Sequence, residues 1–241
     1  MADQSVAVVA GVGDGLGKAV ARRFAKAGHL TVLVARKRDR LERIADEIRG
    51  EGGAAEVAPT DLRDETQIRD LFERVASLGP LAVTVFNAGA QHRQDPLEVE
   101  PAMFEKVWRL GCQAGFMVGQ EAARLMVGQG HGTIIFTGAT ASVRGGADFV
   151  AFAAAKAGLR SVAQSMARAL GPKGVHVCHV VIDGVIDMPA IHERFPDLAG
   201  SMAEDGMLST DAIAATYHAL HCQERSAWSF EVDVRPWSEP F

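Results

Sequence analysis

The chain has 241 residues, of which 48% are hydrophobic, so it is long enough for one α/β domain with a sizeable core. Its net charge of −5, with no basic stripe longer than the segment 36–38, argues against a nucleic-acid partner. The N-terminal segment lacks a basic region and the apolar run after it is cut by glycines, which argues against a signal peptide and a membrane span. Three widely spaced cysteines argue against a disulfide framework and a zinc site, and together these features favour a cytoplasmic protein.

The first predicted elements are a strand over residues 5–10, a glycine-rich turn and a helix over residues 18–27. Glycines let the backbone turn tightly and approach a pyrophosphate, whose charge is then bound by the first N–H groups of the helix. A glycine cluster alone also suits a plain tight turn, but the flanking strand and helix indicate a dinucleotide site. The predicted cofactor-binding residues of this turn are Gly11, Gly13, Gly15, Leu16 and Gly17.

A second predicted strand, over residues 30–35, ends just before Arg36 and an amphipathic helix over residues 39–49. In a dinucleotide fold the end of this strand faces the adenosine ribose. An acidic residue there binds the 2′-hydroxyl, and a basic residue accepts a 2′-phosphate. Arg36 therefore favours NADP(H) over NAD(H). A solvated basic turn is the alternative, and Asp14 in the glycine turn would repel a 2′-phosphate.

The next units are a strand over residues 54–58, a helix over 65–77 and a strand over 81–86. Two short motifs follow these strands, Asp61-Leu62 and Asn87-Ala88-Gly89. Together with the glycine turn they stand at the intervals usual in the short-chain dehydrogenase/reductase family, which the chain resembles from about Val6 to Val234. The resemblance implies that the Asp61 position contacts the adenine ring and that the Asn-Ala-Gly turn lies along the cofactor. Asp61 as a plain helix N-cap is the alternative.

Apolar residues at helical spacing predict a long helical segment from Pro101 to Met126. The family resemblance implies that a helix here packs against a partner subunit, so a homodimer or homotetramer is expected. Family members commonly carry an asparagine in this helix that positions a proton-relay water, and Cys112 stands at that place. Cys112 is either a buried structural cysteine or a reactive thiol.

Residues 132–137 predict the next strand. The family usually ends this strand with a pair of serines, and the second of them hydrogen-bonds the substrate carbonyl. Ala139 stands at that position in this chain. Thr140 and Ser142 are nearby hydroxyls that could take its place, and Thr140 as an ordinary turn residue is the alternative.

The alanine-rich run from Asp148 predicts the start of a helix that ends near Leu170. Its family counterpart is Tyr-x-x-x-Lys, in which the tyrosine exchanges a proton with the substrate oxygen while the lysine lowers its pKa and holds the nicotinamide ribose. Lys156 is present, but Phe152 stands at the tyrosine position, and the only tyrosine is Tyr217. The sequence thus excludes ordinary carbonyl reduction through the family's tyrosine.

The strand predicted over residues 175–182 places His176 and His179 on opposite faces, which argues against joint ligation of a metal. The turn Gly184-Val185-Ile186 after it is expected to meet the nicotinamide carboxamide. Residues 187–207 are expected to form a substrate lid, followed by a helix through Leu220 and a strand over 228–234. Alternating strands and helices predict one domain, 1–241, with a doubly wound parallel sheet of about seven strands.

Two functional hypotheses follow from this pattern. The first is an NAD(P)(H)-dependent oxidoreductase that acts on a small, apolar carbonyl, alcohol or activated alkene. Its proton would come from Thr140, Ser142, a lid residue or water. The second is a cofactor-binding sensor or scaffold without hydride chemistry, suggested by the departures at Cys112, Ala139 and Phe152. Retention of a lysine and a lid favours the enzyme.

Overall fold

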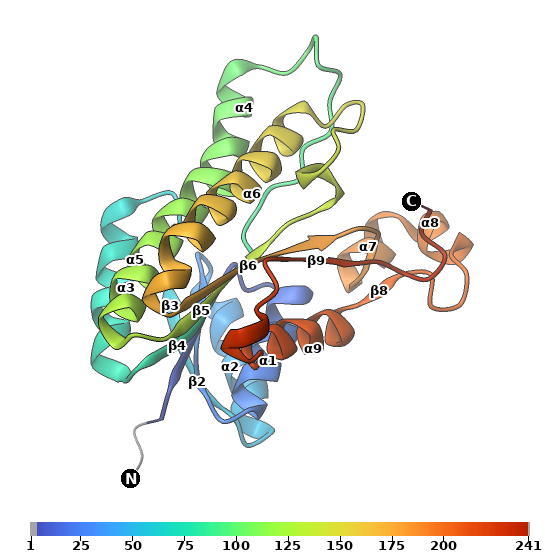
Figure 1. Cartoon of the computed structure of the whole chain (residues 1–241). Coiled ribbons are helices and arrows are strands. Elements are labelled where there is room, and N and C mark those ends of the chain that lie inside the picture. The colour runs from blue at the N-terminus through green and yellow to red at the C-terminus, as the bar shows by residue number, and fades with distance from the viewer. Residues whose placement is uncertain (1–3, 241) are drawn as a thin grey trace.

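The computed structural model describes residues 4–240, and a parallel seven-stranded sheet in the order β3-β2-β1-β4-β5-β6-β9 forms its centre (Figure 1). The predicted doubly wound parallel sheet is therefore confirmed. Residues 1–3 and 241, which the predicted domain range and the interpretation of the N-terminus include, lie outside the described part.

The strands and helices alternate along most of the chain. The strands are β1 (Val6–Ala10), β2 (Leu30–Ala35), β3 (Ala54–Pro59), β4 (Leu81–Phe86), β5 (Gly132–Thr137), β6 (Val175–Ile182), β7 (Ile186–Asp187), β8 (Leu208–Ser209) and β9 (Glu231–Val234). The α-helices are α1 (Leu16–Lys26), α2 (Arg38–Gly50), α3 (Glu65–Leu78), α4 (Pro101–Trp108), α5 (Ala114–Gln129), α6 (Val150–Leu170), α7 (Pro189–Arg194), α8 (Pro196–Ser201) and α9 (Thr210–His221).

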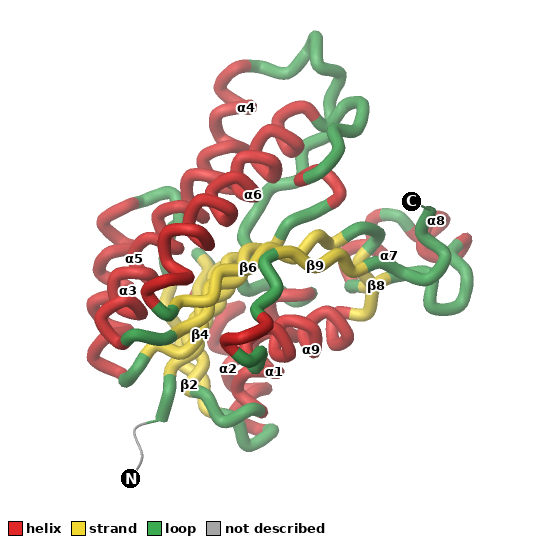
Figure 2. Tube along the Cα trace, viewed as in Figure 1, coloured by secondary structure: helices red, strands yellow, loops and turns green. Residues whose placement is uncertain are grey.

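Helices cover both faces of the sheet, as Figures 1 and 2 show. Apolar side chains of α1, α2 and α9 pack on one face, and those of α3, α5 and α6 pack on the other. Strand side chains alternate between the two cores, so that Val9 belongs to the first and Val8 to the second. Because both faces are covered, the central strands are mostly apolar, and every residue of β6 is buried, including His176 and His179.

Several boundaries differ from the sequence prediction. The long helical segment is divided between α4 and α5 by a π turn over Arg109–Gln113, which contains Cys112. Helix α6 begins at Val150 because Asp148 has a positive φ of 62° and cannot continue a helix. The last strand begins at Glu231 rather than at Trp228, whose ring stacks on the His176 ring.

The segment after β6 folds back along the C-terminal end of the sheet. It contains the short strands β7 and β8, which pair with each other, and the short helices α7 and α8. The C-terminal end lies beside α7 and α8 in Figure 1, and the Trp237 indole donates a hydrogen bond of 3.1 Å to the Glu204 carbonyl. Across residues 4–240, no helix has the length and apolar character that a membrane crossing needs.

Candidate cofactor and substrate site

The glycine turn packs directly on the Asn-Ala-Gly turn at the carboxyl ends of β1 and β4. Gly11 has a φ of 104°, and a Cβ added there would lie 2.5 Å from the Ala88 nitrogen. A Cβ at Gly17 would lie 2.5 Å from the Gly11 carbonyl oxygen, which also accepts a 3.1 Å hydrogen bond from the Asn87 side chain. These close approaches require glycine at positions 11 and 17.

The glycine turn leads directly into α1, whose N-cap is Gly15. None of the described side chains caps the first turn of α1, so its first N–H groups are available to an anion. Leu16 is buried and anchors that turn in the core, whereas Gly13 is open, with only an Arg40 guanidinium nitrogen 4.0 Å from its Cβ position. Met188 covers Gly15, since its sulfur would lie 2.8 Å from a Cβ there.

The adenosine end of the predicted cofactor site is rich in arginine. Arg36 is exposed at the end of β2. Asp14 is paired with Arg40, at 3.4 Å, and with Arg43, and the Arg43 hydrogen bond holds the pKa of its carboxyl below the ordinary value. The negative charge expected to repel a 2′-phosphate is therefore balanced by two guanidinium groups.

Asp61 is held in place by its neighbour in the chain. The Arg63 side chain donates a hydrogen bond of 2.9 Å to the Asp61 carboxylate, and the Arg63 backbone donates another of 3.1 Å. The Arg63 hydrogen bond lowers the pKa of Asp61 to about 2, with a smaller contribution from the charge of Arg36. Asp64, rather than Asp61, is the N-cap of α3, because its side chain accepts from the Thr66 and Gln67 backbones.

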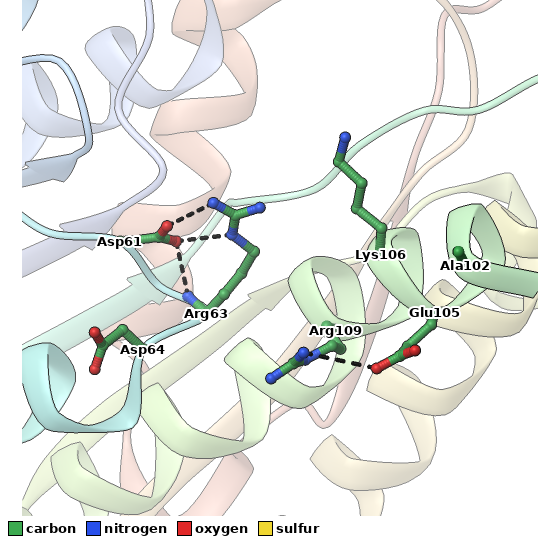
Figure 3. Close-up of a pocket in the computed structure, with 7 residues that line it drawn as sticks. All are labelled: Asp61, Arg63, Asp64, Ala102, Glu105, Lys106 and Arg109. Carbon is green, nitrogen blue, oxygen red and sulfur yellow. Dashed lines mark hydrogen bonds and ion pairs between the residues drawn. The ribbon is translucent and has the colours of Figure 1, made fainter.

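A charged pocket of about 340 Å³ opens between this segment and α4, and Figure 3 shows its lining. Asp61, Arg63 and Asp64 lie on one side, and the α4 side chains together with Arg109 lie on the other. The pocket adjoins the predicted adenine site but contains none of the residues around Lys156. The pocket therefore lies next to the predicted adenosine end of the site and does not include Lys156.

Lys156 lies where the carboxyl ends of β4 and β5 meet α6. Its amine donates a hydrogen bond of 2.7 Å to the Thr137 carbonyl and lies 3.7 Å from the Cβ position of Gly89. The side chain is buried, and burial lowers the pKa of its amine to about 8. Lys156 is thus fixed beside the Asn-Ala-Gly turn and is able to exchange a proton near neutral pH.

Phe152 is one helical turn before Lys156 on α6. It is half-buried, and its ring centroid lies 5.9 Å from the Lys156 nitrogen. Tyr217 does not replace it, because Tyr217 is fully buried in the core on the α1 and α9 face of the sheet. The Tyr217 hydroxyl donates to the Thr137 side chain, and burial raises its pKa.

The two candidate hydroxyls after β5 have different partners. The Thr140 hydroxyl donates to the Asp183 carboxylate, whereas the Ser142 hydroxyl accepts a 3.0 Å hydrogen bond from the Ala139 backbone N–H. A hydroxyl has one proton, so Thr140 can offer a further partner only its lone pairs while it binds Asp183. Ser142 keeps its proton but is buried.

Asp183 is a residue that sequence reasoning missed. Its side chain is buried after β6, where it accepts from Thr140 and lies 3.1 Å from an Arg235 nitrogen and 3.5 Å from an Arg144 nitrogen. The available signal was a carboxylate directly after the apolar run of β6, since buried charges need partners. Those partners are distant in sequence, which is why the pattern alone did not reveal them.

The turn after Asp183 is fixed by the C-terminal segment. Gly184 has a φ of 145°, and a Cβ there would lie 2.7 Å from the Pro236 ring. The Val185 carbonyl accepts a 2.8 Å hydrogen bond from the Leu208 backbone, and Ile186 pairs with Leu208 between β7 and β8. The carbonyl of Val185 is therefore already bonded, although the turn keeps its place at the end of β6.

His179 occupies space next to the end of β5 on the α6 side of the sheet. Its ring fills the Cβ position of Gly138, and its Nδ1 lies 2.9 Å from the Glu231 carboxylate, which Arg160 also binds. Burial lowers the pKa of His179 to about 4, so the imidazole is neutral and donates from Nδ1. His176 lies on the other face, as predicted, and bonds the Ser229 carbonyl at 2.9 Å.

Cys112 lies in the π turn and packs against α6. Its sulfur would be 2.8 Å from a Cβ at Gly158. Burial raises the pKa of the thiol, so it stays protonated. This environment suits the structural role better than the reactive one.

Comparison with known proteins identifies the family. The short chain dehydrogenase family matches residues 5–198, most of the chain. The chain belongs to the short-chain dehydrogenase/reductase family. A short chain dehydrogenase/reductase of Colletotrichum higginsianum is 32% identical over 194 residues, which cover 79% of this chain and 72% of that protein.

Solved structures of the same family share the whole fold. A short-chain dehydrogenase from Rhodopseudomonas palustris is 40% identical, with a TM-score of 0.83 over 98% of this chain and 100% of that one. A metagenomic short-chain oxidoreductase in complex with NADP is 28% identical, with a TM-score of 0.82 over 96% of each chain. This short-chain dehydrogenase/reductase is accordingly an oxidoreductase of the family type.

The residues present fit a dinucleotide cofactor. No described side chain caps the first turn of α1, although Met188 lies over Gly15, and Lys156 lies beside Gly89 on the same sheet edge. In open α/β sheets, ligands bind at the carboxyl ends of the strands, and both features lie there. The backbone and side chains at this edge thus have the chemistry that recognition of a phosphate and a ribose requires.

Proposed function

We propose that the chain is an NADP(H)-dependent oxidoreductase that interconverts a small, largely apolar carbonyl compound or activated alkene and its reduced product. The observation that carries this proposal is Lys156, which is buried and fixed on the Thr137 carbonyl beside the cofactor turn. A lysine in this environment suits both ribose binding and proton exchange. Phe152, whose ring centroid lies 5.9 Å from the Lys156 nitrogen, and Phe149 at the start of the same helix provide apolar surface.

The preference for NADP(H) rests on the arginines at the adenosine end. Arg36 is free to meet a 2′-phosphate, and Arg40 and Arg43 balance the charge of Asp14. Planar guanidinium groups are well suited to phosphate because they bind it with two parallel hydrogen bonds. The NADP complex of the metagenomic relative supports the same preference.

The proton route has to differ from the family's usual one, because Phe152 and Ala139 stand where we expect the family's tyrosine and serine. NADP(H), when bound, donates or accepts the hydride. We assign the proton to Lys156, whose pKa of about 8 leaves it charged at neutral pH and able to donate through a water molecule. Thr140, whose own proton is bound to Asp183, cannot donate to the carbonyl oxygen, but it accepts a hydrogen bond from the hydroxyl of the alcohol form.

Two further assignments complete the proposal. Residues 187–207 form a lid, since Met188 already lies on the glycine turn and Trp237 ties Glu204 to the C-terminal segment. The protein forms a homodimer or homotetramer through α4 and α5. Three aromatic side chains are 36 to 42% exposed along these two helices: Phe104, Trp108 and Phe116. Burial of such a stripe favours association.

The test combines cofactor binding with turnover. Fluorescence titration should show NADPH binding, and a panel of carbonyls and enones should contain a substrate. Lys156→Met should weaken NADPH binding about tenfold or more and abolish turnover, because a charged hydrogen bond is lost. Lys173→Met, which changes an exposed lysine, is the matched control. Tight NADPH binding without turnover of any compound would instead favour the sensor or scaffold hypothesis.

A further inference from the structure

Arg144 pairs with Asp183, a carboxylate that has two other partners. Asp183 accepts from Thr140 at one oxygen and lies 3.1 Å from the Arg235 guanidinium at the other. Arg144 approaches the oxygen that Thr140 already occupies, at 3.5 Å, and its side chain is 52% exposed. If Arg144 turned away, the buried carboxylate would keep a hydroxyl and a guanidinium as partners, so the cost would be small.

The turn that carries Arg144 lies against the N-terminal part of α6. The Arg144 backbone donates a 3.0 Å hydrogen bond to the Thr140 carbonyl, which ties it to the end of β5. Two glycines follow Arg144. A Cβ added at Gly145 would lie 3.9 Å from the Ala153 Cβ, and a Cβ added at Gly146 would lie 3.3 Å from the Phe149 ring. The turn that carries Arg144 therefore lies between the carboxylate after β6 and the Phe149 ring at the start of α6.

We propose that Arg144 binds a carboxylate of the substrate, so that the substrate class is oxo acids and hydroxy acids with an apolar body. This inference rests on the proposed oxidoreductase function. A guanidinium binds a carboxylate through two parallel hydrogen bonds, and the rings of Phe149 and Phe152 contact the hydrocarbon part. Arg93, the other cation near Phe149, is the one cation paired with Asp148 among the described residues, whereas Asp183 keeps Arg235 when Arg144 leaves, so Arg144 is the better anion ligand.

The test compares acids with their uncharged esters. Levulinate and acetylbenzoate, each beside its methyl ester, are assayed with NADPH and the wild-type protein, Arg144→Met and Arg93→Met. Calorimetric titration of acetylbenzoate into the NADP-loaded protein gives a second readout that needs no turnover. NADPH affinity, measured for each variant, shows that the cofactor site is intact.

The kcat/KM of the wild-type protein should be about tenfold or more higher for the acid than for the ester, or its affinity for the acid should be higher by the same factor, as expected for a charge-assisted pair. Arg144→Met should abolish this preference and leave NADPH affinity unchanged, while Arg93→Met should keep it. Equal use of acid and ester by the wild-type protein overturns the inference. So does an unchanged preference in Arg144→Met, or a protein that binds NADPH but neither binds nor turns over either acid. Failure to bind NADPH at all contradicts the proposed function instead.

Discussion

Acidification should destabilise this protein through His179. The pKa of this histidine is about 4 in the folded state, because burial disfavours the charged ring, against about 6.5 in the unfolded chain. The unfolded state therefore binds more protons between these values. The stability contributed by the neutral ring is complete above about pH 6.5 and is lost as the pH falls toward 4. Integration from about pH 7 to about pH 4.5 gives a loss of roughly 2.5 kcal/mol in the free energy of unfolding.

Denaturant unfolding at several pH values measures this loss directly. His179→Gln removes the titrating group and keeps an amide that can donate to Glu231, so its unfolding free energy should depend less steeply on pH. His131→Gln, at an exposed position, should leave the wild-type slope unchanged. His221, whose pKa burial also lowers to about 4, accounts for a remaining slope in the variant. An identical slope in His179→Gln and wild type would show that the reasoning about His179 is wrong.

Three further substitutions test the site and the fold. Gly11→Ala should lower the free energy of unfolding by about 2 kcal/mol or more, because its Cβ would lie 2.5 Å from the Ala88 backbone nitrogen at a φ of 104°. Gly28→Ala is the control in the same denaturation assay and should cost less, because Gly28 has a similar φ but open space around its Cβ position. Arg36→Glu should weaken NADPH binding at least tenfold and spare NADH in fluorescence titrations. Trp108→Glu should lower the oligomeric state in light scattering, and an unchanged mass would contradict the proposed interface.

The parts of the fold that depend on local sequence were predicted well. The glycine turn, the Asn-Ala-Gly turn and the strand over 132–137 each follow from residues close together in the chain. Strand and helix periods also predicted the parallel sheet, because alternating units with short connections allow few other topologies. The π turn at Cys112 was not predicted, since its residues have the same helical spacing as their neighbours.

Long-range polar contacts were beyond sequence reasoning. Thr140 and Asp183 are 43 residues apart, and Arg160 and Glu231 are 71 residues apart, so neither pair forms a local pattern. Each pair joins elements that meet only after the sheet is complete. The sequence supplied the candidates at one end, such as Thr140, but it did not show that the proton of this hydroxyl is already bound.

The end of β5, where we expect the chain to depart from the family pattern, is packed against β6. The His179 ring fills the Cβ position of Gly138, so a side chain could not be restored there without moving the histidine. His179 is in turn bonded to Glu231, which binds Arg160 one helical turn beyond Lys156. Phe152→Tyr alone would therefore add a hydroxyl to a site in which the His179 ring occupies the place of a side chain at position 138. We expect the Phe152→Tyr variant to give weak carbonyl reduction at most. Turnover as high as that on the chain's own substrate would show that the packing of His179 against Gly138 does not limit carbonyl reduction.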